Sequence, residues 1–315
     1  MEYQRLGKTG LKVSKISLGS WLTYGNAIEK ETAIATIDKA YELGINFFDT
    51  ANVYAQGDAE KVVGQALRRY NRDSYVLATK VFHPMGDGPN DRGLSRKHVF
   101  EQVHASLKRL NLDYVDILYC HRFDPQTPLE ETLRTIEDLI RQGKVLYMGV
   151  SEWTAAQIVE GLRVQDRYLL DHIVVNQPVY NLLNRYIEDA VVPTCIQNGI
   201  GLVVFSPLAQ GLLTGKYRKG QKIPANSRAA DPRANQFIQR IYTDENLAKI
   251  EKLIPIAEEL NITLAQLSLA WILHQPGITS TLIGASRPSQ IEENIKALDV
   301  KLSPAILEKI DQIVQ

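Results

Sequence analysis

The sequence predicts an α/β protein of the (β/α)8 (TIM) barrel class, with an N-terminal β-hairpin and an extra C-terminal helix. Apolar runs alternate with amphipathic helical segments eight times over about 300 residues, which implies a parallel sheet with right-handed crossovers that closes into a barrel. The runs are apolar throughout, as strands covered on both faces are. A doubly wound sheet is the alternative, but its glycine-rich first turn is absent from LGSWLTYGN at residues 18–26.

The predicted elements follow one another in a regular order. Short alternating segments on either side of Gly7-Lys8-Thr9-Gly10 predict the hairpin. The predicted strands are residues 16–19, 45–49, 74–80, 115–121, 145–151, 171–177, 200–209 and 280–286. The helices that follow them are predicted at residues 31–43, 58–70, 95–111, 128–144, 154–164, 186–199, 244–260 and 288–298.

Three further segments complete the expected fold, in which residues 1–315 form a single domain. Residues 206–243 are too long for an ordinary connection and predict a functional loop. Residues 303–313, with Ser303 as cap and Pro304 in the first turn, predict a helix outside the eightfold repeat. Residues 261–286 carry no Asp, Glu, Lys or Arg, but Pro276-Gly277 divides them into a buried helix, a turn and a buried strand.

Composition narrows the class of function. The 315 residues are 44% hydrophobic and 23% charged, with 36 basic and 36 acidic side chains, so a nucleic-acid partner is not expected. The first 20 residues lack the apolar core of a secretory signal. Cys120 and Cys195 offer neither a disulfide framework nor metal-ligand spacing. We expect a cytoplasmic protein that binds no membrane and no metal.

Polar side chains occur where the predicted strands end, which is where a barrel carries its catalytic residues. Asp49 and Tyr54 follow the second strand, Lys80 the third and His121 the fourth. Further strand ends carry Ser151, Asn176 with Gln177, Ser206, and Ser286 with Arg287.

Each of the first four residues has a simpler explanation alone: a turn cap, a rim aromatic, an exposed lysine or a core histidine. Neighbouring strands would nevertheless bring them to one side of the barrel mouth. There Lys80 would favour the phenolate of Tyr54, whose ordinary pKa is about 10. Asp49 would keep Lys80 charged. His121 would bind a substrate carbonyl or polarise the phenol. The constellation predicts a proton donor that still needs a source of hydride.

A series of motifs in order resembles the aldo-keto reductase superfamily, in particular the branch of the potassium-channel β-subunits and their bacterial relatives. The resemblance covers essentially the whole chain. It rests on RLGKTGLKVSKISLGSW, GINFFDTANVYAQGDAEKVVG, LATK, LDYVDILYCHRFDPQTPLEETL, GKVLYMGVSEW, NQPVYNLLNR, VVFSPLAQGLLTGKY and LIGASRPSQIEENI.

The resemblance implies a catalytic tetrad and a nicotinamide cofactor, usually NADPH, bound without a Rossmann fold. Tyr54 would be the general acid, Lys80 and Asp49 would tune it, and His121 would orient the carbonyl. Ser151 and Gln177 would hold the carboxamide, and Phe205 would stack on the nicotinamide ring. The full set of implied cofactor residues is Ser20, Trp21, Asp49, Ser151, Gln177, Phe205, Ser206, Pro207, Leu208, Gln210, Gly211, Lys216, Arg228, Gly284, Ser286, Arg287, Gln290, Glu293 and Asn294.

The last motif also favours NADP(H) over NAD(H). Pro288 suits the first turn of a helix, so Ser286 and Arg287 precede a helix N-terminus, which attracts an anion such as a 2′-phosphate. Gln290, Glu293 and Asn294 would face the adenosine.

The chain also departs from its relatives. Many of them have Asn or Arg at the position of Glu152, and Tyr or Trp at that of Phe205. The channel β-subunits have Asn at the position of His121, so histidine here favours an enzyme. The substrate is expected to be a small carbonyl compound in a pocket lined by loop aromatics, which are Trp21, Tyr24, Phe82, Phe123 and Trp153.

Three functions follow from the sequence. The first is an NADPH-dependent reductase of aldehydes or ketones with Tyr54 as general acid. The second is a regulatory, nucleotide-binding subunit with little turnover, although the hairpin starts too near residue 1 for an inactivating N-terminal segment. The third is a barrel isomerase or lyase acting on sugar phosphates. Members of the branch often form homo-oligomers, so such an assembly remains open.

Overall fold

The fold is a closed barrel of eight parallel strands, as predicted. The computed structural model describes residues 1–25, 27–225, 227–232 and 234–314. The strands close in the order β10-β3-β4-β5-β6-β7-β8-β9. Their bounds are β3 Ile16–Gly19, β4 Phe47–Asp49, β5 Val76–Val81, β6 Val115–Cys120, β7 Val145–Ser151, β8 Ile173–Gln177, β9 Gly201–Phe205 and β10 Ile278–Ile283.

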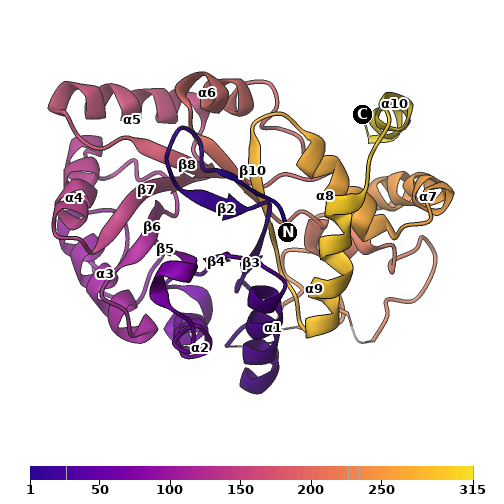
Figure 1. Ribbon diagram of the computed structural model, residues 1–315, viewed down its shortest axis with the longest axis horizontal. Coiled ribbons are helices and arrows are strands. Elements are labelled where there is room, and N and C mark those ends of the chain that lie inside the picture. Colours follow the sequence, from indigo (N-terminus) through magenta and orange to yellow (C-terminus); the bar gives the residue numbers. More distant parts are fainter. Residues whose placement is uncertain (26, 226, 233, 315) are drawn as a thin grey trace.

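Helices surround the barrel (Figure 1). Helix α10 lies outside the eightfold repeat, as expected from Ser303 and Pro304, and the Ile306 amide donates to Ser303 Oγ at 3.3 Å. The helices are α1 Lys30–Glu42, α2 Asp58–Leu67, α3 Arg96–Leu110, α4 Leu129–Arg141, α5 Ala155–Tyr168, α6 Val191–Asn198, α7 Asp244–Glu259, α8 Leu264–His274, α9 Pro288–Asn294 and α10 Pro304–Val314.

The N-terminal hairpin closes one end of the barrel. Strands β1 (Tyr3–Arg5) and β2 (Lys12–Ser14) pair antiparallel and lie across the barrel in Figure 1. The Lys8 amide donates to the Gly199 carbonyl at 2.8 Å, just before β9 begins. Gln4 donates to the carbonyl of Ile278, the first residue of β10, at 2.8 Å. The hairpin therefore covers the N-terminal ends of the strands and leaves their C-terminal ends open to the loops.

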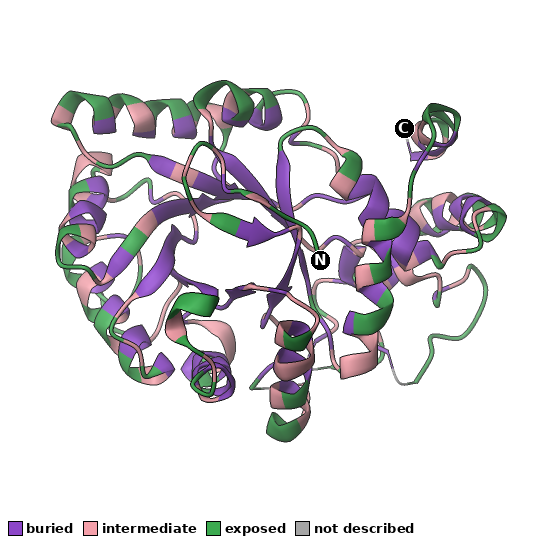
Figure 2. Cartoon of the chain, in the orientation of Figure 1, coloured by how far each residue is buried: buried purple, intermediate pink, exposed green. Residues whose placement is uncertain are grey.

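Apolar side chains form two cores. One lies between the strands and the surrounding helices, whose inner faces are buried and whose outer faces are exposed (Figure 2). The other fills the barrel interior, where Leu6 and Val13 of the hairpin pack with Phe47, Ile117 and Val203. Burial on both faces explains why the strands are apolar throughout.

Several predicted bounds differ from the structure. The strand predicted at residues 45–49 is shorter, and the strand predicted at 200–209 ends at Phe205. The helix predicted at 186–199 begins only at Val191, because residues before it form turns. Residues 261–286 do form a buried helix, α8, and a buried strand, β10. Among the described residues, no helix is both long and apolar enough to cross a membrane.

Candidate active site

The C-terminal ends of β4 and β5 place a buried ion pair at the barrel mouth. The Lys80 ammonium donates to the Asp49 carboxylate and, at 2.9 Å, to the Thr50 carbonyl. Gln177, at the end of β8, donates from Nε2 to the other Asp49 oxygen at 2.9 Å. Three strand ends thus meet at one carboxylate.

Burial disfavours the charged forms of both partners of this pair. It raises the pKa of Asp49 and lowers the pKa of Lys80, while their mutual attraction opposes both shifts. Because the Gln177 amide also donates to Asp49, the carboxylate has partners on both oxygens. The hydrogen bonds therefore support the charged form of the pair that was predicted from sequence.

Tyr54 lies on a tight loop between β4 and α2. Ala55, Gln56 and Gly57 have positive φ values of 49°, 51° and 94°, which turn the chain sharply before the helix begins. Lys80 Nζ lies 4.9 Å from the centre of the half-buried Tyr54 ring. The phenol thus stands over the ion pair, as the five-residue separation from Asp49 suggested.

The acidity of Tyr54 differs from the prediction. Burial, followed by the negative charge of Asp49, raises the pKa of Tyr54 well above its ordinary value, and Arg122 opposes the shift. The prediction that Lys80 lowers this pKa is wrong for the free protein. The physical reason is that Asp49 neutralises the charge of Lys80, so burial has the largest effect on the pKa of Tyr54. Tyr54 consequently holds its proton at neutral pH.

His121, directly after β6, completes the group. Its ring centre lies 5.7 Å from that of Tyr54, with the rings edge to face. Burial, followed by the charge of Lys80, holds the pKa of His121 well below its ordinary value, so the imidazole is neutral. Within the described part of the chain, buried Nδ1 has no hydrogen-bond partner. A ligand that hydrogen-bonds there would satisfy it.

The predicted carboxamide and nicotinamide residues lie beside this group. Ser151 Oγ donates to the Gln177 carbonyl at 2.9 Å. Ser20 is buried, and its amide donates to the Asp49 carbonyl at 3.0 Å. The Trp21 ring lies edge to face with Phe205 at 6.1 Å and tilted against Tyr54 at 6.5 Å. Polar groups and aromatic rings therefore share one end of the barrel.

The segment after β9 forms an irregular loop with its own polar network. Gln210 donates from Nε2 to Ser206 Oγ at 2.7 Å and accepts at Oε1 from Arg228 Nη1 at 2.6 Å. Positive φ at Ser206 (54°), Ala209 (46°), Gln210 (58°) and Gly211 (101°) gives the backbone repeated left-handed turns. Pro207 is buried, Leu208 is half-buried and the exposed Lys216 places its ammonium 5.3 Å from the Tyr217 ring centre.

The last predicted motif follows β10, which pairs with β9 and β3. Gln290 Oε1 accepts from the Ser286 amide at 2.7 Å and from its hydroxyl at 3.2 Å. Arg287 is exposed and donates to Ser289 Oγ at 3.0 Å. Gly284 and Glu293 are exposed as well, whereas Asn294 is buried. These residues flank the start of α9, and among the described residues their hydrogen bonds do not reach the tetrad.

Two of the expected pocket aromatics are core residues. Tyr24 and Trp153 are each only 1% exposed, so they cannot line an open pocket in this conformation. Phe123, which packs edge to face on Trp153 at 5.0 Å, is half-buried, as are Trp21 and Phe82. The loops fold back over the barrel, which strand-end positions alone do not reveal.

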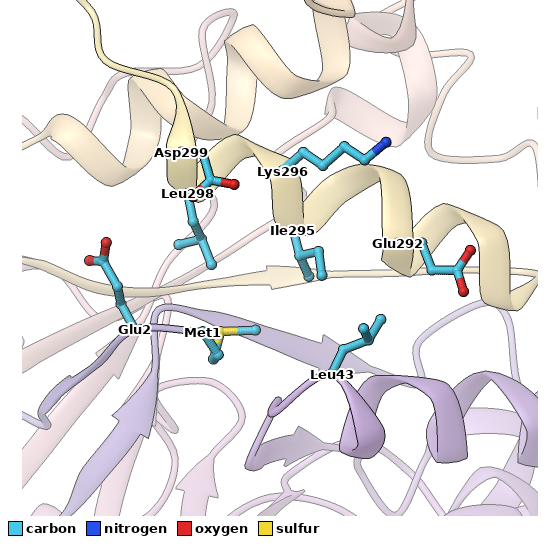
Figure 3. Close-up of a pocket in the computed structure, with 8 residues that line it drawn as sticks. All are labelled: Met1, Glu2, Leu43, Glu292, Ile295, Lys296, Leu298 and Asp299. Carbon is cyan, nitrogen blue, oxygen red and sulfur yellow. The ribbon is translucent and has the colours of Figure 1, made fainter.

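A pocket of about 390 Å³ lies away from the barrel mouth, between the N-terminus, α1 and α9 (Figure 3). Its lining is Met1, Glu2, Leu43, Glu292, Ile295, Lys296, Leu298 and Asp299, none of which is a predicted site residue. In the described ranges, no group of three or more His, Cys, Asp or Glu residues is arranged to hold a metal ion.

Sequence reasoning missed two residues beside the tetrad. Arg122 Nη1 donates to the His121 carbonyl at 2.5 Å and lies 3.5 Å from Ser151 Oγ. The His83 ring packs edge to face on His121 at 4.6 Å. Arg122 directly follows His121 in CHRFD, and His83 lies three residues after Lys80 in KVFHP, so the rule of strand ends could have included both.

Comparison with known proteins gives consistent matches. The model of the aldo/keto reductase family matches residues 15–315. A probable voltage-gated potassium channel subunit beta of Arabidopsis thaliana is 48% identical over 100% of this chain and 97% of its own length, and one of Oryza sativa subsp. japonica is 46% identical with the same coverage. A putative subunit of Schizosaccharomyces pombe is 44% identical over 99% of this chain and 93% of its own length. These matches confirm the resemblance stated from the motifs.

Proposed function

The chain belongs to the aldo/keto reductase family, and from this premise we propose that it is an NADPH-dependent reductase of aldehydes or ketones. The observation that carries the proposal is the buried Asp49–Lys80 pair beneath the Tyr54 ring. Structural ion pairs do not need a phenol held over them by consecutive left-handed residues. A proton donor beside a neutral imidazole suits the protonation of the oxygen in carbonyl reduction.

The chain offers suitable groups for the cofactor. Buried His121 Nδ1 lacks a partner in the described ranges, and the left-handed turns from Ser206 to Gly211 are of the kind that exposes backbone amides to anions. The nicotinamide end would be held by Ser151, Gln177 and Phe205. The pyrophosphate would be bound by the loop that carries Lys216 and Arg228. Ser286, Arg287 and Gln290 would face the adenosine and its 2′-phosphate. A bound NADPH would supply the hydride for the carbonyl carbon.

The residues of the chain would act on the carbonyl oxygen. Tyr54 is protonated at neutral pH, so its hydroxyl can donate a proton as negative charge develops on that oxygen. Arg122 opposes the rise in the pKa of Tyr54 and would therefore favour the phenolate left behind, while Asp49 holds Lys80 beneath the ring. Neutral His121 would donate a second hydrogen bond to the oxygen.

The relatives are named as probable potassium channel subunits, which favours a second candidate. It is the regulatory subunit expected from the sequence, which would bind the nucleotide with little turnover. By the resemblance stated from the motifs, which implies Asn at this position in channel β-subunits, His121 favours the enzyme. Negligible turnover across carbonyl substrates, together with co-purification with a membrane partner, would favour the regulatory function. Absence of NADPH binding in a fluorescence titration would instead favour an isomerase or lyase.

The proposal is tested with the Tyr54→Phe variant. We expect the rate of reduction of a test aldehyde to fall by about 10²- to 10⁴-fold, the contribution typical of a general acid. NADPH affinity, measured by fluorescence titration, should be retained. Tyr3→Phe, which removes the hydroxyl of a half-exposed tyrosine in the hairpin, is the matched control. Normal turnover by Tyr54→Phe would refute the role of Tyr54.

A further inference from the structure

Arg122 brings a guanidinium to the edge of the tetrad. It directly follows His121, and its Nη1 donates to the His121 carbonyl at 2.5 Å. The same nitrogen lies 3.5 Å from Ser151 Oγ, at the end of β7. The side chain is half-buried. Its other nitrogens, Nε and Nη2, donate no hydrogen bond within the described part of the chain.

The positive charge of Arg122 lacks a carboxylate partner. Among the described residues, no ion pair within 4.0 Å includes Arg122, whereas the adjacent charges of Lys80 and Asp49 neutralise each other. The two nearby imidazoles, His83 and His121, both have lowered pKa values and add no positive charge at neutral pH. An incoming anion could pair with this guanidinium and accept hydrogen bonds from it.

Asp124 is the acidic residue nearest to Arg122 in the sequence, but its Oδ1 accepts from the Gln126 amide at 3.0 Å and its Oδ2 from the Leu94 amide at 2.7 Å. Glu152 directly follows Ser151, and its Oε1 is also engaged elsewhere. This oxygen accepts from the Val179 amide at 2.6 Å and from the Tyr186 hydroxyl at 3.2 Å. These contacts hold Glu152 against the loop after β8. Arg122 therefore keeps donors free beside the reacting groups.

We propose that Arg122 forms an anion subsite next to the tetrad, so that the preferred substrates are aldehydes or ketones carrying a carboxylate. This assignment of substrate class rests on the proposed reductase function. The planar guanidinium offers parallel N–H donors that match the two oxygens of a carboxylate. Binding the carboxylate to Arg122 would hold the substrate at the mouth where Tyr54 and His121 lie.

The test compares matched acids and esters. Wild type, Arg122→Gln and Arg122→Lys are assayed with 3- and 4-carboxybenzaldehyde and with the methyl ester of each, using NADPH. We expect wild type to prefer the acids and the ratio of kcat/KM for acid over ester to fall about 10- to 100-fold in Arg122→Gln. The acid-to-ester ratio of Arg122→Lys should lie between those of wild type and Arg122→Gln. Arg68→Gln, which removes an exposed arginine after α2, should keep the wild-type ratio.

A binding measurement separates this inference from the reductase function. Calorimetric titration uses the 3- and 4-carboxybenzyl alcohols and their methyl esters, with and without NADP⁺. Carboxylate binding that weakens at least tenfold in Arg122→Gln supports the subsite even if wild type reduces no aldehyde. Equal binding of acid and ester by wild type, no carboxylate binding, or an unchanged acid-to-ester ratio in Arg122→Gln would overturn it. An unchanged ratio would mean that Arg122 only connects the His121 carbonyl to Ser151 at the end of β7.

Discussion

At the scale of single residues, His121 links the site to the stability of the protein. Burial and the nearby charges of Lys80, His83 and Arg122 keep its folded-state pKa well below the ordinary 6.5. The unfolded chain therefore binds one more proton than the folded protein as pH falls below about 6.5. The stability that neutral His121 contributes is complete above that pH and is lost as pH decreases toward its folded pKa.

We predict that His121→Asn reduces the pH dependence of stability. Between pH 6.5 and pH 5, the free energy of unfolding of wild type should decrease relative to the variant by up to about 1.4 kcal/mol per pH unit, the value for one proton. Urea denaturation at pH 5.0, 6.0 and 7.5 measures this difference. His83 and His98, whose pKa values are also lowered, are present in both proteins. Parallel stability curves would mean that His121 does not titrate differently on folding.

Strand-end reasoning indicated which residues lie together at the barrel mouth. Asp49 and Lys80 meet because their strands are parallel neighbours with their C-terminal ends at one edge, which sequence order alone indicates. The acidity of Tyr54 could not be predicted, since it depends on the balance between burial and a charge pair. Burial of Tyr24 and Trp153 was missed because a loop residue carries no periodic pattern that shows its direction.

At the scale of elements, the strands and helices could be predicted because each has its own hydrophobic period. The predicted ends of these elements were less accurate where the hydrophobic pattern continues into a loop. Residues 200–209 are apolar to Ala209, but positive φ at Ser206 ends the strand at Phe205. The start of α6 was missed for the same reason, since residues 186–190 suit a helix but form turns.

Helix α2 is held close to α3 because Gly64 has no side chain. A Cβ at Gly64 would lie 2.3 Å from the Leu110 carbonyl oxygen, a backbone atom that cannot move away alone. The same helix carries buried Glu60, which accepts from Thr79 Oγ1 at 2.6 Å and from Arg109 Nε at 2.6 Å. Close packing of α2 thus fixes the end of the loop that bears Tyr54.

We predict that Gly64→Ala destabilises the protein by about 1–3 kcal/mol, because overpacking outweighs the better helix propensity of alanine. Urea denaturation measures the loss. Gly10→Ala is the matched control, since the nearest atom to its added Cβ is Arg5 Nη1 at 4.0 Å. The free energy of unfolding of Gly10→Ala should stay within about 0.5 kcal/mol of that of wild type. Equal effects of the two substitutions would contradict close contact between α2 and α3.

At the scale of the whole molecule, the two ends of the barrel have different roles. The hairpin bonds to residues just before β4 and β9 and to the first residue of β10, as in the Ser14 amide that donates to Asn46 Oδ1 at 2.7 Å. The candidate site lies at the other end, where these strands finish. Such a division is expected of barrels, in which the N-terminal face supports stability. That the whole chain folds as one domain stays a prediction.

This division predicts that Leu6→Ala lowers stability without changing catalysis. Leu6 is fully buried in the barrel interior, so truncation should cost about 2–5 kcal/mol, measured by urea denaturation. Leu169→Ala makes the same truncation at an 87% exposed leucine and should cost less than about 0.5 kcal/mol. At a temperature where all variants are folded, Leu6→Ala should keep the wild-type kcat and KM for aldehyde reduction, because Leu6 lies at the end opposite Tyr54. A loss of kcat in the folded variant would show that the hairpin and the site are coupled through the barrel interior.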